Sequence, residues 1–171
     1  IVKDPFDRKN TNTNTPAVIH YDFINGDKVK LDVLPKGFGS ENSSRMKMFN
    51  PTDSQDMVID FIVEAVKEAG PGACPPLVLG IGIGGTLDKA CLLAKEAMLR
   101  PIHNPSKIAN IAKLEKRIFE AVNKTGMGPM GLGGNTSCLG VNVLTYPTHI
   151  AGMPVCVNMS CHVLRSASAT I

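Results

Sequence analysis

The sequence contains few aromatic residues and no tryptophan. It has two tyrosines and six phenylalanines among 171 residues, and its formal net charge is only +3. Proteins that bind single-stranded nucleic acids stack the bases on aromatic side chains beside a basic groove. Because the lysines and arginines are scattered along the chain and stacking residues are scarce, we expect no nucleic-acid partner.

Long hydrophobic runs are also missing. No stretch approaches the roughly 20 apolar residues that a membrane-spanning helix needs, and the N-terminal IVKDPFDRKN lacks the pattern of a signal peptide. The five cysteines are an odd number in apolar surroundings, which argues against a secreted disulfide framework. We therefore expect reduced thiols and a cytoplasmic location. The start without methionine suggests that the chain is a fragment.

The composition that remains is that of a globular domain, with 43% hydrophobic and 19% charged residues. Residues 17–34 contain two β-like runs around Asn25-Gly26, a strong signal for a β-hairpin. Residues 35–45 are predicted to form a glycine- and serine-rich loop. The apolar spacing after them predicts a helix over residues 52–70.

The remaining sequence alternates helices and strands. Its predicted elements are a strand over 77–79 with a glycine turn, a helix over 86–99, a helix opened by Asn104 and Pro105, a loop over 126–137, and strands over 139–146 and 154–159. In the helix opened by Asn104 and Pro105, the buried stripe includes Ile118 and either Leu114 or Glu115. We predict one α/β domain over 1–171, with a mixed sheet, an N-terminal β-hairpin and flanking helices.

The stretch PPLVLGIGIGGTLDKACLLAKEAM contains Gly80, Gly82 and Gly85, which match the G-x-G-x-x-G pattern of dinucleotide-binding proteins. That pattern needs a second strand about 20 residues later, ending in an acidic residue. Here that distance leads to MLRPIHNPSK, which has neither feature. A P-loop is excluded because no Gly-Lys-Ser/Thr follows. Close packing of strand against helix is the preferred interpretation, and a turn bordering another ligand is the alternative.

Two loops present cysteines in unusual surroundings. GPGACPP holds Cys74 between a glycine turn and two prolines, and THIAGMPVCVNMSCHVLR places Cys161 where a strand-like run becomes polar. The second loop also allows a zinc site made of His149, Cys156, Cys161 and His162, although its cysteine spacing differs from the C-x₂-C of zinc ribbons.

Five segments together resemble the class I, iron–sulfur fumarate hydratases. Within that group they look more like the α subunit of the two-subunit form, a family that includes the α subunit of L(+)-tartrate dehydratase. The segments are NTPAVIH, PKGFGSEN, ACPPLVLGIGIGGTLDKACLLAKEAMLRP, GMGPMGLGGNTSCLGVNV and THIAGMPVCVNMSCHVLR. The resemblance implies a hydro-lyase that interconverts L-malate and fumarate, with L(+)-tartrate as an alternative substrate. A zinc-bound or metal-free binding module is the third hypothesis.

The resemblance also implies a [4Fe–4S] cluster with Cys74 and Cys161 as two of its three thiolate ligands. The third ligand belongs to a Cys-Gln-Asp-Thr-Gly motif that this sequence lacks and that we expect upstream. The iron without a protein ligand would bind substrate as a Lewis acid. Cys91, Cys138 and Cys156 fall where relatives commonly carry Ala or Thr, and are interpreted as packing residues.

Further residues are implied to contact a small dicarboxylate substrate. A family Lys-Gly-Gly-Gly-Ser loop matches Lys36 to Ser40, with Phe38 in place of a glycine. Lys36 and the backbone amide of Gly39 are expected to meet a substrate carboxylate. His149 matches a family histidine near the substrate, as a catalytic hydrogen-bond donor or a loop anchor.

The resemblance finally implies partners. A fumarase β subunit or C-terminal domain would complete the site and take part in proton abstraction, and the αβ unit would form a homo-oligomer. We therefore expect the isolated chain to be inactive and, in air, to lack an intact cluster.

Overall fold

The computed structural model describes all residues, 1–171, and divides into two compact units. The first unit comprises Ile1–Lys30 and Thr170–Ile171, and the second comprises Leu31–Ala169. In the first unit no side chain is buried, so this unit has no hydrophobic core of its own. Val29 and Ile171 exchange two backbone hydrogen bonds of 2.9 Å there.

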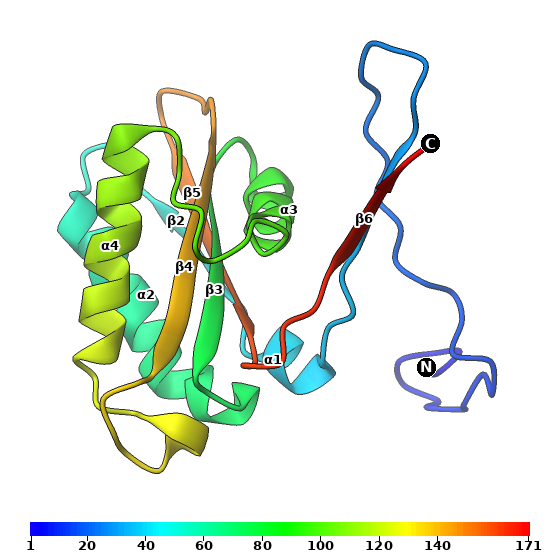
Figure 1. Cartoon of the computed structure of the whole chain (residues 1–171), viewed down its shortest axis with the longest axis horizontal. Coiled ribbons are helices and arrows are strands. Elements are labelled where there is room, and N and C mark those ends of the chain that lie inside the picture. Colours follow the sequence, from blue (N-terminus) through cyan, green and yellow to red (C-terminus); the bar gives the residue numbers. More distant parts are fainter. The chain divides into compact units, whose positions relative to one another are not determined.

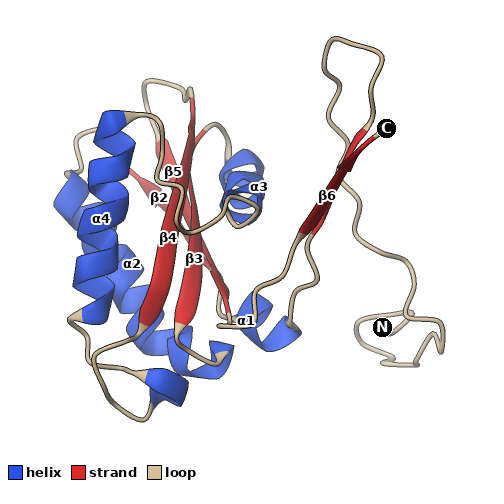
Figure 2. Ribbon diagram, in the orientation of Figure 1, coloured by secondary structure: helices blue, strands red, loops and turns tan.

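The second unit is built on a four-stranded mixed sheet with the order β2-β5-β3-β4 (Figures 1 and 2). Its strands are β2 (Arg45–Phe49), β3 (Leu77–Gly84), β4 (Cys138–Tyr146) and β5 (Met153–Ser160). Strands β3 and β4 are parallel, whereas β5 runs antiparallel to both β3 and β2. The prediction of an α/β fold with a mixed sheet and flanking helices is confirmed.

Helices cover both faces of this sheet. Helices α2 (Gln55–Ala69) and α4 (Ala109–Asn123) lie on one face, and α3 (Leu87–Ala97) lies on the other (Figure 1). The short elements are α1 (Phe38–Asn42) and two 3₁₀ turns, η1 (Gly70–Ala73) and η2 (Pro129–Gly131). None of the helices combines the length and apolarity needed to span a bilayer.

Strand β3 shows why the glycines are there. Successive residues of a strand face opposite sides of the sheet, so Leu79 and Ile81 point into the core with α2 and α4 and are fully buried. Gly80 and Gly82 face α3, where a Cβ atom would lie 2.0 Å from a helix carbonyl oxygen in either case. The glycines therefore permit close strand–helix contact. The strand also extends to Gly84, so the glycine run is mostly strand, not the turn that we predicted.

The predicted N-terminal hairpin does not form as two strands. Strand β1 (Lys30–Val33) pairs with β6 (Ala167–Thr170) from the C-terminal end of the chain, and residues 17–24 are not in a strand. Asn25-Gly26 does make a bend. A local turn signal cannot reveal that a distant segment competes for the same strand edge, and here that segment is the one that pairs.

Two further predicted elements also need correction. The stretch 35–45 contains helix α1 and the start of β2, because Ser40 and Ser43 are buried against neighbouring backbone and order the segment. Helix α4 begins at Ala109 with Ile108 as its N-cap, not at residues 104–105. The backbone amide of Ser106 donates to Glu115 at 2.9 Å, and this bond holds the segment before α4 in a non-helical turn.

Candidate active site

Cys74 and Cys161 lie at the same edge of the sheet, where β3 begins and β5 ends. We call this place the cysteine edge. Strand β3 begins shortly after Cys74, and β5 ends just before Cys161. The two strands are antiparallel, with Val78 paired to Ser160, so the segment that enters β3 and the segment that leaves β5 share one edge. His162 connects the two segments directly, since its Nδ1 lies 3.1 Å from the carbonyl oxygen of Cys74.

Cys74 is held in an uncommon backbone conformation. Its φ of 55° and ψ of 66° are left-handed, a region that costs a non-glycine residue about 1–2 kcal/mol. Such a residue persists only where its surroundings fix it. His162 binds its carbonyl oxygen, and the amide of Met130 donates to the carbonyl oxygen of Pro75 at 2.9 Å. The glycine-rich loop 126–137 therefore supports the turn that leaves the Cys74 thiol exposed.

Helix α1 brings the predicted substrate residues to the turn that precedes Cys74. The Ser43 hydroxyl donates to the carbonyl oxygen of Ala69 at 2.9 Å, which fixes α1 against the end of α2. A Cβ atom at Gly39 would lie 3.2 Å from the carbonyl oxygen of Gly72 in η1. Gly39 therefore lies against η1, whose C-cap is Cys74.

Lys36 lies at the same edge and is largely buried. Its Nζ is 3.1 Å from the Ser40 hydroxyl and 3.2 Å from Glu41 Oε2, and only 10% of its side chain is exposed. Burial lowers the pKa of Lys36 below its ordinary value, while Glu41 opposes that shift. The same Glu41 carboxylate accepts a hydrogen bond of 3.3 Å from Asn158 in β5, three residues before Cys161. The structure thus brings together Lys36, Gly39, Cys74 and Cys161.

His149 is not part of this group. It lies in the turn between β4 and β5, where its Nδ1 accepts a hydrogen bond of 3.2 Å from the amide of Ala151. Strand β5 has eight residues and separates His149 from Cys161, which corresponds to roughly 25 Å. The alternative zinc site is therefore wrong, because His149 and Cys161 lie at opposite ends of one strand.

The other three cysteines are less accessible than Cys74. Cys138 and Cys156 are buried, and Cys91 packs beside Cys156 between α3 and the sheet. Burial raises the pKa of both Cys138 and Cys156 to about 12, so these thiols stay protonated. The chain contains no group of three His, Cys, Asp or Glu side chains that could hold a metal ion. A cluster with three thiolate ligands would need one from outside these 171 residues.

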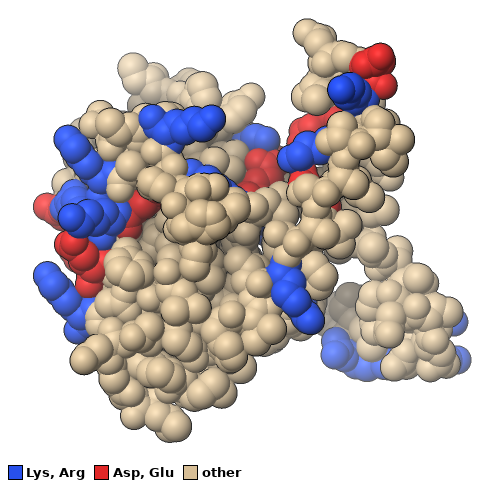
Figure 3. Space-filling view, in the orientation of Figure 1, with Lys and Arg blue, Asp and Glu red and all other residues tan.

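The surface around the cysteine edge carries little charge. From Thr125 to Leu164 the sequence has no Asp, Glu, Lys or Arg. Figure 3 shows the result, a broad uncharged surface at the end of the second unit where β3 begins. Several apolar side chains on segments that reach this end are solvent-exposed, namely Phe38, Met130, Leu132 and Val163. An uncharged, partly apolar surface of this kind is typical of a protein contact.

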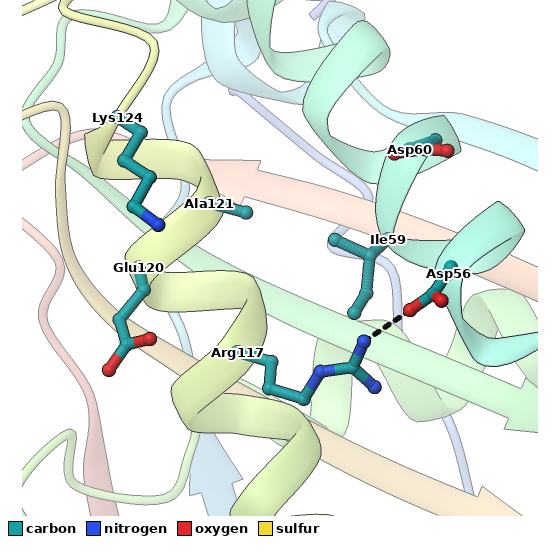
Figure 4. A pocket seen from close by; sticks show the side chains of 7 residues that line it. All are labelled: Asp56, Ile59, Asp60, Arg117, Glu120, Ala121 and Lys124. Carbon is teal, nitrogen blue, oxygen red and sulfur yellow. Dashed lines mark hydrogen bonds and ion pairs between the residues drawn. The ribbon is translucent and has the colours of Figure 1, made fainter.

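A separate groove of about 290 Å³ lies between α2 and α4 (Figure 4). Its lining side chains are Asp56, Ile59, Asp60, Arg117, Glu120, Ala121 and Lys124. The Arg117 guanidinium forms an ion pair with Asp56 and donates to Gln55 Oε1 at 2.9 Å. These charges fasten the two helices to each other, and the groove contains none of the predicted site residues.

Comparison with known proteins identifies the family. Residues 1–170 match the family of fumarate hydratase (Fumerase). The chain belongs to this family. A Methanocaldococcus jannaschii protein named for the alpha subunit of L(+)-tartrate dehydratase is 40% identical over 171 residues, which cover 97% of this chain and 60% of that protein. The L(+)-tartrate dehydratase alpha subunit of Escherichia coli K12 is 31% identical over 170 residues, which cover 97% of this chain and 56% of that subunit.

Membership of this family fixes the reaction class of the relatives, since fumarate hydratase and tartrate dehydratase are both hydro-lyases. The chain spans somewhat more than half of the length of the curated relatives that it matches. The name "subunit alpha" says that those relatives act together with another subunit.

The family motif contained residues that we did not single out from the sequence. Glu41 belongs to PKGFGSEN itself, and in the structure it contacts Lys36, Lys95 and Asn158. Its place in the motif was an available signal. No sequence signal indicated Lys95 or Asn158, because they reach Glu41 only through the packing of α3 and β5 beside α1.

Proposed function

We propose that this chain forms part of the α subunit of a hydro-lyase that removes water from a four-carbon hydroxydicarboxylate. The proposal depends on one observation. The segments that contain Cys74 and Cys161 meet at one edge of the sheet, where His162 Nδ1 lies 3.1 Å from the Cys74 carbonyl oxygen. Gly39 lies against η1, which ends at Cys74, and Lys36 directly precedes the N-cap of the same helix α1. A thiol pair, a cation and an open backbone amide together suit an anionic substrate next to a metal centre.

In this proposal Cys74 and Cys161 hold two irons of a [4Fe–4S] cluster, and the third thiolate comes from outside these residues. The donor set fits a cluster because both thiols are at least partly exposed and soft sulfur ligands suit iron–sulfur clusters. When bound, the cluster supplies a Lewis-acidic iron for the leaving hydroxyl. The chain itself contributes Lys36 and the Gly39 amide, which bind and orient a carboxylate.

L(+)-tartrate is the proposed substrate. The two relatives reported above are named for tartrate dehydratase, which supports tartrate over malate. L-Malate and fumarate are the second candidate, because the matching family is named for fumarate hydratase. The two hydroxy acids differ by one hydroxyl group, so the side chain that meets that hydroxyl decides between them.

The proposal includes a companion subunit or domain that covers the cysteine edge and takes part in proton abstraction. The uncharged surface with exposed Leu132 and Met130 supports a protein contact there. A cytoplasmic location and a homo-oligomer of the αβ unit belong to the same proposal. Within one chain His149 lies at the other end of β5, so its proposed catalytic role would require a second copy of the chain.

The test starts with the α subunit that contains this chain, assembled anaerobically with its companion subunit, iron and sulfide. L(+)-tartrate dehydration and malate–fumarate interconversion are then assayed. We expect Cys74→Ala and Cys161→Ala each to abolish turnover and to lower the iron content. Cys91→Ala is the matched control and should retain both. Turnover that survives the loss of Cys74 and Cys161 would refute the cluster assignment, and faster turnover of malate than of tartrate would favour the second candidate.

A further inference from the structure

Glu41 is the centre of a polar cluster beside the cysteine edge. Its Oε1 lies 2.5 Å from Lys95 Nζ, and its Oε2 lies 3.2 Å from Lys36 Nζ. The side-chain amide of Asn158 donates to the same carboxylate at 3.3 Å. One carboxylate in α1 therefore receives donors from the loop before α1, from α3 and from β5.

The cluster keeps one excess positive charge, because two lysines share one carboxylate. Lys36 is the more buried of the two lysines, with 10% of its side chain exposed against 40% for Lys95. A buried ammonium is costly without a partner of opposite charge. Glu41 is the acidic side chain that provides this partner to Lys36, and no other ion pair of Lys36 is present.

The direction of the Lys36 ammonium is also set by Glu41. An ammonium has three hydrogen-bond donors, and Ser40 and Glu41 receive two of them. Both acceptors lie in α1. The remaining donor is available to a ligand.

Asn158 provides a second, independent sign that this cluster is organised. It is 2% exposed, and its amide nitrogen donates to Ser44 at 2.7 Å as well as to Glu41. Its Oδ1 is buried without a hydrogen-bond partner. Such an unpaired oxygen costs free energy, so the orientation that lets Asn158 donate to Glu41 is maintained at the expense of its own acceptor.

We propose that Glu41 is a positioning residue that holds the Lys36 ammonium at the cysteine edge, where Lys36 receives one carboxylate of the substrate. The inference rests on the proposed function for its substrate class. Glu41 itself touches no substrate. The alternative role is a purely structural tie between α1 and α3 through Lys95, and that role makes a different prediction for the two lysines.

The experiment uses the assembled enzyme and succinate, a dicarboxylate that carries no hydroxyl group to eliminate. The variants are Glu41→Gln, Glu41→Asp, Lys36→Met and the matched control Lys95→Met. Dissociation constants for succinate are measured by calorimetry on enzyme without iron, and KM and kcat are measured on loaded enzyme. We expect Glu41→Gln and Lys36→Met each to raise the succinate dissociation constant and KM about tenfold, with kcat changed less. Glu41→Asp should restore part of the affinity.

The double variant decides between the two roles. If Glu41 acts through Lys36, then Glu41→Gln adds nothing to the loss caused by Lys36→Met. Lys95→Met should change succinate affinity less than threefold, a limit set below the tenfold effect expected for Lys36. Additive losses, equal losses from both lysine variants, or unchanged affinity in Glu41→Gln would each overturn the inference.

Failure of the proposed function gives a different pattern. If the wild-type enzyme binds succinate through Lys36 in a way that depends on Glu41, but dehydrates neither tartrate nor malate, the proposed reaction is wrong and the positioning role of Glu41 stands. If wild-type enzyme turns over either substrate and Glu41→Gln keeps the wild-type KM and succinate affinity, only the positioning role fails. Wild-type enzyme that does not bind succinate at all would also overturn the positioning role.

Discussion

The imidazole of His162 lies 3.1 Å from the carbonyl oxygen of Cys74, although the two residues are 88 positions apart in the chain. A carbonyl oxygen only accepts hydrogen bonds, so Nδ1 of His162 is the donor. The bond joins the segment that enters β3 to the segment that leaves β5. It thereby connects the neighbourhoods of the two cysteines that we propose as cluster ligands.

The five thiols are expected to differ in their rates of alkylation. Cys74 is exposed and should react first with iodoacetamide at pH 8, whereas Cys138 and Cys156 should react last. Because burial raises the pKa of Cys138 and Cys156 to about 12, their thiolate fraction is about a thousandfold lower than that of an ordinary thiol. Mass spectrometry of the labelled peptides at successive times measures the order. Labelling of Cys138 as fast as Cys74 would contradict the burial described here.

Loss of the His162 side chain should weaken the cysteine edge. His162→Ala removes the hydrogen bond to the Cys74 carbonyl oxygen, which is worth about 1 kcal/mol. Without this bond the Cys74 backbone can leave its left-handed conformation. We expect less iron per chain after anaerobic reconstitution. His149→Ala, at the far end of β5, is the control and should keep the wild-type iron content. Equal iron loss in both variants would mean that the effect is not local.

Substitution of a strand glycine should be costly. In Gly82→Ala the new Cβ would lie 2.0 Å from the carbonyl oxygen of Ala90, so α3 must move away from β3. Overpacking of this kind lowers the free energy of unfolding by about 3 kcal/mol. Urea denaturation measures the change. Gly152→Ala is the control, since its nearest neighbour would be the tip of Met48 at 4.0 Å.

The stability of the protein should depend on Glu41 in acid. Burial tends to raise the pKa of Glu41, but hydrogen bonds from Lys95, Asn158 and Lys36 outweigh burial, so the pKa lies below its ordinary value of 4.5. A lowered pKa means that the ionised carboxylate stabilises the folded state above that ordinary value, and that this contribution is lost as the pH falls through the folded pKa. Wild-type protein should therefore lose stability more steeply than Glu41→Gln below about pH 5. Parallel curves from denaturation at several pH values would contradict the assignment.

Glu115 is a buried carboxylate whose removal should destabilise the fold. It is 5% exposed, pairs with Arg100, and accepts the amide of Val143 at 2.8 Å. Glu115→Ala leaves the Arg100 guanidinium without its carboxylate partner and the Val143 amide without its acceptor, which should cost about 3 kcal/mol. Glu120→Ala on the exposed side of the same helix is the control. Thermal or urea unfolding of both variants makes the comparison.

Local sequence patterns predicted the helices and strands that depend only on their own residues. Two β-like runs predicted strands β4 and β5 close to their observed bounds, and the apolar spacing in α2 predicted its buried stripe. The family motifs indicated Cys74 and Cys161 as candidate ligands without any tertiary information. The glycines of β3 were correctly interpreted as packing residues, because the acidic residue and second strand of a nucleotide site are missing.

Tertiary contacts decided the features that depend on distant partners. The sequence left open whether Leu114 or Glu115 is buried, and both are, because Arg100 and two backbone amides from elsewhere in the fold satisfy the carboxylate. In the same way β1 pairs with the C-terminal β6 and not with its neighbour in sequence.

The candidate site shows the same division. Residue type and motif selected the two cysteines and Lys36, since thiolate and ammonium chemistry can be read from single positions. Only the antiparallel pairing of β3 with β5 brought the cysteines to one edge and left His149 at the other. The role of Glu41 also became visible only when α3 and β5 placed Lys95 and Asn158 against its carboxylate. A sequence specifies which groups are available, whereas their distances and charges depend on how the strands pair.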